Sequence, residues 1–598
     1  MTYAAPIPEI RFVVHELADL AKVQALPGHE EATPDLVDAV LEEAGKFGTE
    51  VLAPLNQIGD QQGSVFENGI VRTPEGFIEA YRQFVDSGWN SVPFDPEYGG
   101  QGLPWLVSTA VSEVWHAANM AFALCPMLTQ AAAELLHAHG SAECKATFLP
   151  KLISGEWTGT MNLTEPQAGS DLARVRTKAV RDGDHYRIAG QKIFITWGEH
   201  DMAENIIHMV LARLPDAPEG VKGLSLFVVP KFLVEDGGQL GSHNDLRCVS
   251  IEHKLGIKAS PTAVMSFGDN EGAIGYLIGS ENRGLEHMFL MMNNARLAVG
   301  LEGVGIADRA YQLARAYALE RVQGRKIGSD DPSPVVIAHQ PDVQRMLLSM
   351  KSQTEAARAL ACFVAASIDV SKRHPDEAER RRHDRLVGLL TPVVKAWSTD
   401  IGIEVADIGI QVHGGMGYIE ESGAPQHLRD ARIASIYEGT NGIQANDLIG
   451  RKVSRDKGAA AADLIALMRG LDTELAAARS DDLAAIRTQL RAGIDELAQA
   501  TSWLVETFPA QPRVPAAGAV YYLKLMGTVA GGWMMAKAAL VAERKLASGE
   551  GDPRFLKAKI ISARFFADHY LSRAGGLKRA FLEGGTVLQA LEPEDFLL

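Results

Sequence analysis

The spacing of apolar residues changes twice along this chain, and those changes limit the folds available to it. Over 33–150 apolar side chains recur every three or four positions, as they do in amphipathic helices. Near Gly159 the pattern changes to β-branched and alternating runs, which predict strands as far as residue 275. Near Gly284 the helical spacing returns and continues to about residue 577. This order predicts a mostly α protein with a central β domain.

A chain of 598 residues is longer than one hydrophobic core usually holds, so we expect several domains. The expected ranges are 1–34 for an N-terminal arm, 35–159 for a helical domain, 160–278 for the β domain, 279–455 for a second helical domain and 461–598 for an additional C-terminal helical domain, with a linker at 457–460. A β domain between two helical blocks creates a crevice, and cofactor sites are common in such crevices.

The net charge of −17 favours solubility and argues against broad electrostatic binding to nucleic acid or to an anionic membrane. We therefore expect no nucleic-acid partner. The four cysteines, Cys125, Cys144, Cys248 and Cys362, are far apart and lack the spacing of metal ligands. We interpret them as small packed residues in a protein of a reducing compartment, and we expect no bound metal.

We expect neither a signal peptide nor an integral membrane segment. Residues 1–11 contain no basic region followed by an apolar stretch. The most apolar stretch, 514–541, is interrupted by Lys524 and Lys537 and is rich in glycine and alanine. This stretch predicts a tightly packed helix pair, and not a membrane span. With the cysteine content, these features predict a cytoplasmic protein.

Two short hydrogen-bond donors stand in the segment 161–171, where helix gives way to strand. Thr164 and Ser170 are separated by a proline turn, and Gly169 allows the backbone to approach a ligand closely. Successive N–H groups in such a turn suit a phosphate or the edge of a heterocycle. The alternative is an ordinary Pro/Gly turn before a hairpin.

A flat ring and a hydroxyl occur at the end of the strand that follows. Phe194 and Thr196 are two residues apart, so their side chains point to the same face. A planar ring system would stack on the first and hydrogen-bond to the second. Ordinary strand packing is the alternative.

Two further motifs suit a phosphate-bearing ligand. Gly414 and Gly415 follow Gln411 at a predicted helix end, where adjacent glycines let the backbone approach a ligand. Arg321 ends another predicted helix, and arginine is suited to pairing with phosphate. The alternatives are a helix C-cap followed by a turn, and a solvated helix end.

A glutamate with an aromatic neighbour marks the last motif, in the segment 436–444. Glu438 lies between Tyr437 and a Gly-Thr turn. We interpret Glu438 as a catalytic base, because a carboxylate sheltered from water is better matched to a weakly acidic C–H group.

Together, the order and spacing of these motifs resemble the acyl-CoA dehydrogenase family. The resemblance covers about 35–450. It rests on Leu-Thr-Glu-Pro at 163–166, Gly-Ser-Asp at 169–171, Phe-Ile-Thr at 194–196, the segment 254–260, Arg296, Arg321, His339, Gln340, Gln411, Gly414, Gly415, Arg-Asp at 429–430 and Glu-Gly-Thr at 438–440. The arm and the module after residue 460 resemble a longer subgroup, which includes bacterial enzymes acting on 3-methylmercaptopropionyl-CoA.

The resemblance implies a helical domain, a β barrel-like domain and a four-helix domain that bind FAD, with Glu438 as the catalytic base. The implied cofactor contacts are Met161, Leu163, Thr164, Gly169, Ser170, Phe194 and Thr196 at the flavin and pyrophosphate, Thr440, Asn441 and Gly442 after the base, and Arg321, His339, Gln340, Gln411, Gly414 and Gly415 at the adenosine diphosphate of a neighbouring subunit. The implied substrate contacts are Ser170, Arg296 and Gly439.

The chain departs from the family pattern near the implied adenine end. Gly324 and Arg325 follow Gln323 directly where relatives usually show Phe-Gly, and about eight extra residues precede His339. These departures lie in the segment that carries the implied adenine-end contacts Arg321, His339 and Gln340.

The implied reaction is α,β-dehydrogenation of an acyl-CoA to the trans-2-enoyl-CoA, as in fatty acid β-oxidation. Glu438 would remove the α-proton and flavin N5 would accept the β-hydride, with electrons passing to electron-transfer flavoprotein. The acyl group stays open: a short, medium or long fatty acyl chain, or 3-methylmercaptopropionyl. We expect a homodimer, with a tetramer as the alternative.

Two other functions remain as alternatives. An acyl-CoA oxidase would use the same site and pass its electrons to oxygen. A flavin-bearing, DNA-binding damage-response protein shares the fold but needs a basic C-terminal region, and 451–598 is close to charge balance. The C-terminal module has two interpretations of its own, a domain that packs over the dimer and a membrane-associating segment. The lack of a strongly apolar or polybasic helix favours the first.

Overall fold

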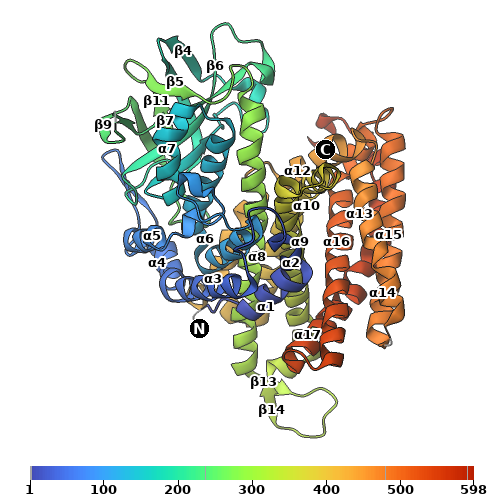
Figure 1. The fold of residues 1–598 in the computed structure, drawn as a ribbon. Coiled ribbons are helices and arrows are strands. Elements are labelled where there is room, and N and C mark those ends of the chain that lie inside the picture. The colour runs from blue at the N-terminus through green and yellow to red at the C-terminus, as the bar shows by residue number, and fades with distance from the viewer. Residues whose placement is uncertain (1–2, 236, 479, 589, 598) are drawn as a thin grey trace.

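The computed structural model describes residues 3–235, 237–478, 480–588 and 590–597. Three blocks are visible: a β domain at the upper left, long helices in the centre, and a further helical module on the right (Figure 1). The predicted fold class, mostly α with a central β domain and an additional C-terminal helical domain, is confirmed.

The N-terminal block is helical, with its longest element at its centre. Its helices are α1 (Ile7–Phe12), α2 (Leu20–Gln24), α3 (Pro34–Phe47), α4 (Ala53–Gln62), α5 (Phe77–Asp86), α6 (Trp105–His139) and α7 (Ala142–Ser154). Helical spacing at 107–118 and 129–139 predicts helix in both segments. Both lie in α6, which consists of two helical segments that meet at a kink at Asn119, where the backbone is non-helical. The Asn119 side chain accepts a hydrogen bond from the Phe122 amide at 3.1 Å, which restarts the helix.

A short hairpin interrupts this block where helix was predicted. It consists of β1 (Val65–Glu67) and β2 (Ile70–Arg72), which pair antiparallel. Asn68 and Gly69 form its turn with positive φ, which suits a two-residue hairpin loop.

The β domain is one eight-stranded sheet with a small hairpin beside it. The strands are β3 (Trp157–Asn162), β4 (Lys178–Asp182), β5 (His185–Thr196), β6 (Asn205–Arg213), β7 (Leu224–Pro230), β8 (Phe232–Val234), β9 (Leu240–His243), β10 (Leu246–Ile251), β11 (Thr262–Phe267) and β12 (Ala273–Leu277). The order is β10-β11-β5-β12-β7-β6-β3, with β4 against β5 and β6, and β8 with β9. One face of the sheet encloses a core of its own, which includes Ile188, Val210 and Phe227.

Three long helices form the centre of the molecule: α8 (Gly284–Glu320), α9 (Pro341–Arg373) and α10 (Glu377–His413). Two glycines let α8 and α10 approach closely. A Cβ atom on Gly303 would lie 2.2 Å from the carbonyl oxygen of Ser398, and one on Gly300 would lie 2.7 Å from Val394. The helices α11 (Ala424–Ala431) and α12 (Asn441–Asp447) follow. Between α8 and α9, β13 (Val322–Arg325) and β14 (Pro334–Val336) form the projecting hairpin at the bottom of Figure 1.

The C-terminal module contains α13 (Ala459–Gly470), α14 (Asp472–Ala477), α15 (Asp481–Thr507), α16 (Arg513–Ser548), α17 (Pro553–His569), α18 (Ala574–Glu583) and α19 (Gly585–Leu588). The predicted helix pair at 514–541 is wrong, because α16 is one continuous helix. The backbone of α16 at Gly527 and Gly531 packs against the ring of Trp397 of α10. A Cβ atom would lie 2.5 Å from that ring on Gly527 and 2.3 Å from it on Gly531.

Two helical stretches of the described chain are long and apolar enough to cross a membrane, Glu377–Tyr418 and Arg513–Ser548. In the structure 78% and 89% of their apolar windows are buried. Their apolar surface is therefore used in packing against other helices.

The N-terminal arm is held against the C-terminal module by charged side chains. Lys559 of α17 is buried between Glu9 of the arm and Glu355 of α9. Lys545 of α16 lies 2.7 Å from Glu16 of the arm. The two ends of the chain therefore pack on the same central helices.

Candidate active site

The predicted base occupies a strained turn directly before α12. Glu438 has φ +56° and Gly439 has φ +79°. A left-handed backbone is uncommon for a residue with a side chain, and it persists when the surroundings hold it. Thr440 then caps α12, with its hydroxyl accepting from the Ile443 amide at 3.2 Å.

Side chains from two helices hold this turn through its carbonyl groups. Gln444 of α12 donates to the carbonyl oxygen of Glu438 at 2.9 Å. Lys395 of α10 donates to the carbonyl oxygen of Gly439 at 2.9 Å and to Asn441 Oδ1 at 3.0 Å. The amide of Asn441 in turn donates to the Ala396 carbonyl at 3.1 Å. The turn is thus tied to the middle of α10.

The environment of Glu438 is unfavourable to its charge. Although the side chain keeps some access to solvent, the surrounding protein raises its pKa to about 7. Arg296 of α8 and Lys395 oppose this rise through their positive charges. Burial also lowers the pKa of Lys395, to about 8, and that of Arg296. The site therefore places a carboxyl group that titrates near neutrality beside two partly desolvated cations.

The second group of predicted residues meets at one edge of the β domain. Lys192 of β5 donates to the carbonyl oxygen of Leu163 at 3.0 Å, and the amide of Ile193 donates to that of Thr164 at 2.9 Å. These bonds bring the turn after β3 beside the end of β5, where Phe194 and Thr196 lie. Met161 is at the end of β3, and Gly169 and Ser170 are exposed in the same turn.

Phe194 is presented to solvent, and not packed. Its side chain is 59% exposed and its φ is +60°, so the strand displays a large ring at an energetic cost. Thr196, two residues further on, is half-buried. The predicted alternative, ordinary strand packing, does not account for an exposed ring held in this conformation.

The β domain is fastened to the segment that carries the predicted base. Thr196 pairs with Thr262 of β11, and the loop before β11 reaches α11. There the amide of Ile257 donates to Asp430 at 2.5 Å, and Gly256 fits against the backbone of Arg429. Asp430 precedes Glu438 by eight residues, so the edge bearing Phe194 is tied to the turn bearing the base.

The third group of predicted residues lies far from the base within one chain. Arg321, His339, Gln411, Gly414 and Gly415 are exposed, and Gln340 is half-buried. The amide of Ile337 donates to the Arg321 carbonyl at 2.8 Å, and Tyr317 of α8 packs on His413 of α10 with ring centroids 4.5 Å apart. These contacts gather the group at the C-terminal ends of α8 and α10. The rise of a helix separates Arg296 from that end of α8 by roughly 36 Å.

Known protein families match the chain along nearly its whole length. The matches are to the N-terminal domain of acyl-CoA dehydrogenase at 35–156, its middle domain at 160–270, its C-terminal domain at 282–453, and a domain described as acetyl-CoA dehydrogenase C-terminal like at 464–592. The 3-methylmercaptopropionyl-CoA dehydrogenase of Ruegeria pomeroyi is 50% identical over 578 residues, which is 96% of each chain.

The chain belongs to the acyl-CoA dehydrogenase family. A second relative of this acyl-CoA dehydrogenase, butyryl-CoA dehydrogenase of Syntrophomonas wolfei, is 35% identical and spans 100% of this chain and 99% of its own. Among solved structures, Caenorhabditis elegans ACDH-11 in complex with C11-CoA aligns with a TM-score of 0.77 at 20% identity, over 98% of this chain and 96% of that one. The last likeness shows that the fold includes the C-terminal module.

Four residues around the predicted base, Glu438, were not predicted as site residues from the sequence: Lys395, Gln444, Tyr437 and Glu302. Lys395 and Glu302 are charged residues within apolar helical runs, and both are fully buried. An isolated charge in such a run is a signal that sequence inspection can find. Its partner cannot be identified that way, because the contact joins different helices.

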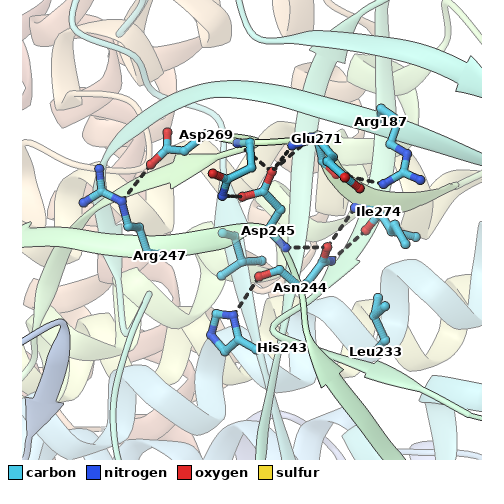
Figure 2. A pocket seen from close by; sticks show the side chains of 12 residues that line it. Arg187, Leu233, His243, Asn244, Asp245, Arg247, Asp269, Glu271 and Ile274 are labelled. Carbon is cyan, nitrogen blue, oxygen red and sulfur yellow. Dashed lines mark hydrogen bonds and ion pairs between the residues drawn. The ribbon is translucent and has the colours of Figure 1, made fainter.

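A separate hollow of about 780 Å³ lies on the β domain of this acyl-CoA dehydrogenase (Figure 2). None of the predicted site residues lines it. Its polar groups are already paired: Asp245 accepts from the amides of Asn270, Glu271 and Gly272 at 2.9–3.0 Å, and Arg247 pairs with Asp269 at 2.7 Å. The chemistry of the family therefore does not point to this hollow.

Proposed function

We propose that this chain is an FAD-dependent acyl-CoA dehydrogenase in which Glu438 removes the α-proton of an acyl-CoA thioester. The observation that carries the proposal is the turn at Glu438. It holds a carboxyl group with a pKa near 7 in a strained conformation, beside Arg296 and Lys395. When bound, FAD supplies the acceptor for the hydride that leaves the β-carbon.

The carboxyl group suits the proton that it would accept. The α-proton of a thioester is weakly acidic, and a raised carboxyl pKa narrows the difference between acid and base. The carbonyls of Glu438 and Gly439 are both engaged by side chains, whereas no acceptor for the Glu438 amide occurs among the described residues. That N–H is free to donate to the thioester carbonyl as negative charge develops on its oxygen.

The residues at the edge of the β domain fit a flavin. The exposed ring of Phe194 offers a stacking surface, and Thr196 offers a hydroxyl two residues further along β5. Nothing lies within 4 Å of where a Cβ on Gly169 would stand, so that turn is open to a bulky ligand. We assign Met161, Leu163, Thr164 and Ser170 to the same surface, with Ser170 also reaching the substrate.

A second subunit would complete the cofactor site. Arg321, His339, Gln340, Gln411, Gly414 and Gly415 cannot meet the ligand of their own Glu438 across the length of α8. We propose that they bind the adenosine diphosphate held mainly by a neighbouring copy. Exposed apolar side chains at the same end support a homodimer, because Ile327, Met416 and Tyr418 are 71%, 50% and 88% exposed.

The substrate assignment is a short acyl-CoA, with 3-methylmercaptopropionyl-CoA as the first candidate. It rests on the relative at 50% identity, which carries that name, and on the butyryl-CoA dehydrogenase at 35%. Arg296 and Gly439 would contact the substrate. Electron-transfer flavoprotein would reoxidise the enzyme in the cytoplasm, as a step of acyl-chain β-oxidation.

The test is anaerobic bleaching of the flavin-loaded protein by a panel of acyl-CoAs that includes the thioether. Wild type should bleach, and Glu438→Gln should not. Glu421→Gln, which changes an exposed glutamate near α11, is the matched control and should bleach as wild type does. Normal bleaching by Glu438→Gln would remove the base assignment. Rapid formation of peroxide in air would favour an acyl-CoA oxidase instead.

A further inference from the structure

One buried carboxyl group near the site has no part in the function described so far. Between Leu297 and Ile306 the sequence of α8 is apolar or glycine except at Glu302. Glu302 is fully buried, one residue before the glycine at which α8 and α10 come closest. Burial of a carboxyl group is costly, and such local exceptions to apolar packing are concentrated at functional sites.

The partner of this carboxyl group is the residue next to the base. The hydroxyl of Tyr437 donates to Glu302 Oε2 at 2.5 Å, across 135 positions of sequence. The other oxygen, Oε1, has no partner among the residues that the structure describes. The charged groups facing Glu302 are Lys395 from α10 and Glu438 itself.

The surroundings of the Glu302 carboxyl group favour its uncharged form. Burial raises its pKa well above the ordinary value, and the nearby charge of Glu438 raises it further, while Tyr437 and Lys395 only partly oppose this. A neutral carboxyl group still offers an oxygen to the tyrosine hydroxyl. The bond therefore does not require a charged Glu302.

The bond to Tyr437 restrains the peptide that carries the Glu438 amide. On one side of this peptide the Tyr437 ring is anchored to α8 by Glu302. On the other side the Glu438 carbonyl is anchored to α12 by Gln444. A donor aimed before the reaction at the place where charge develops requires no reorganisation during it.

We propose that Glu302 is a positioning residue, which acts through the Tyr437 hydroxyl to orient the amide and carboxyl group of Glu438 toward the thioester. The proposal rests on the function proposed above. It assigns to Glu302 the role of hydrogen-bond acceptor for the Tyr437 hydroxyl, which an amide of the same shape can fill and an apolar side chain cannot.

The experiment uses an acyl-CoA analogue in which an ether oxygen replaces the β-carbon. This analogue can lose its α-proton but has no β-hydrogen to transfer, so deprotonation is observed by itself. Exchange of the α-hydrogen with deuterated water gives its rate, and long-wavelength absorption of the enolate stacked on the flavin gives its extent. Binding of the analogue is measured separately by titration.

The variants are Glu302→Gln, Glu302→Leu and Tyr437→Phe, with Tyr522→Phe as the matched control. Tyr522 is buried in the C-terminal module, where its hydroxyl bonds Thr501 at 2.8 Å, and it has no part in the site. We expect Glu302→Leu and Tyr437→Phe to slow exchange about tenfold or more, as loss of an aligned donor does. Binding should change less than about twofold, Glu302→Gln should stay within about threefold of wild type, and Tyr522→Phe should be unaffected.

A double variant separates positioning from a general effect on folding. If Glu302 acts through the hydroxyl, Glu302→Leu should slow exchange no further when Tyr437 is already phenylalanine. Additive losses, normal exchange in Glu302→Leu, or equal damage from Gln and Leu would each overturn the proposal. If Glu302→Leu does not fold, the two single variants Tyr437→Phe and Glu302→Gln decide the question. Slow exchange in the first and near-normal exchange in the second would support the proposal, and any other pair of results would overturn it. Absence of exchange in wild type would instead refute the proposed function itself.

Discussion

The Nζ atom of Lys395 lies 2.9 Å from the carbonyl oxygen of Gly439, the residue directly after the proposed base. The lysine is fully buried in the middle of α10 and also donates to Asn441. One side chain therefore holds the turn in place and adds a positive charge beside Glu438. Because its charge lowers the pKa of Glu438, it keeps part of the base ionised at neutral pH.

Substitution Lys395→Met should slow α-proton exchange and move its pH dependence. Loss of the cation raises the pKa of Glu438 further, so the rising limb of exchange against pH should move to higher pH. A shift of about one unit, from about 7, would reduce the ionised fraction and so slow exchange at pH 7 about fivefold. Lys524→Met is the control, since Lys524 lies 3.5 Å from Asp400 at the surface and such pairs contribute little. If the exchange rate of Lys395→Met rose over the same pH range as that of wild type, the electrostatic role would be contradicted.

The rate of α-proton exchange in wild type should rise with pH through about 7 and then level. Only the ionised carboxylate accepts a proton, and burial raises the pKa of Glu438 to about 7. Exchange into a dead-end analogue, followed by mass spectrometry from pH 5 to pH 9, measures this limb. A rate already constant from pH 5 upward would show that the carboxyl group titrates at its ordinary pKa.

The contribution of Glu438 to the stability of the fold should fall as pH rises, whereas the exchange rate rises. The folded pKa of about 7 exceeds the ordinary value of 4.5, so the folded protein binds the proton more tightly than the unfolded chain does. Stability from this group is therefore present below about pH 4.5 and is lost as pH rises through about 7. The melting temperature of Glu438→Gln, relative to wild type, should increase between pH 5 and pH 8. For Glu421→Gln the difference should not change with pH.

Substitution Phe194→Ala should weaken flavin binding without weakening the fold. The ring is 59% exposed, so its removal leaves little cavity in the protein. The proposed flavin site, however, loses a stacking interaction of about 1 kcal/mol. Equilibrium dialysis of FAD and thermal unfolding of the apoprotein measure the two effects separately. Phe194→Trp should retain the flavin. Unchanged FAD affinity in Phe194→Ala would place the flavin elsewhere.

Substitution Gly531→Val should destabilise the contact between the C-terminal module and α10. A Cβ at this position would lie 2.3 Å from the Trp397 ring, so the helices must move apart. Overpacking of this kind costs about 1–3 kcal/mol. Gly576→Ala in α18 is the matched control, because nothing lies within 4 Å of its added Cβ, and it should be neutral or slightly stabilising. Denaturant unfolding compares them, and equal midpoints for the two variants would show that the contact is loose.

The sequence alone predicted the order of helices, β domain and helices along the chain, with strands between about 160 and 275. The spacing of apolar residues depends on which side of a helix or strand is buried. It can therefore be recognised without knowing which element packs against that side. It failed at 514–541, where the predicted helix pair is one continuous helix. The glycines of that helix are explained by Trp397, which is more than a hundred positions away.

The sequence by itself determined that a glutamate stands before a Gly-Thr turn, and that an aromatic ring and a hydroxyl stand two residues apart in one predicted strand. Local chemistry of neighbouring residues is enough for both. Only the tertiary structure decided which side chains surround that glutamate. Lys395, Arg296 and Glu302 come from helices that the chain brings together through close packing at glycines, and the pKa of Glu438 follows from that packing. The order of these residues in the sequence does not predict which of them are in contact, because their contacts depend on how the helices pack.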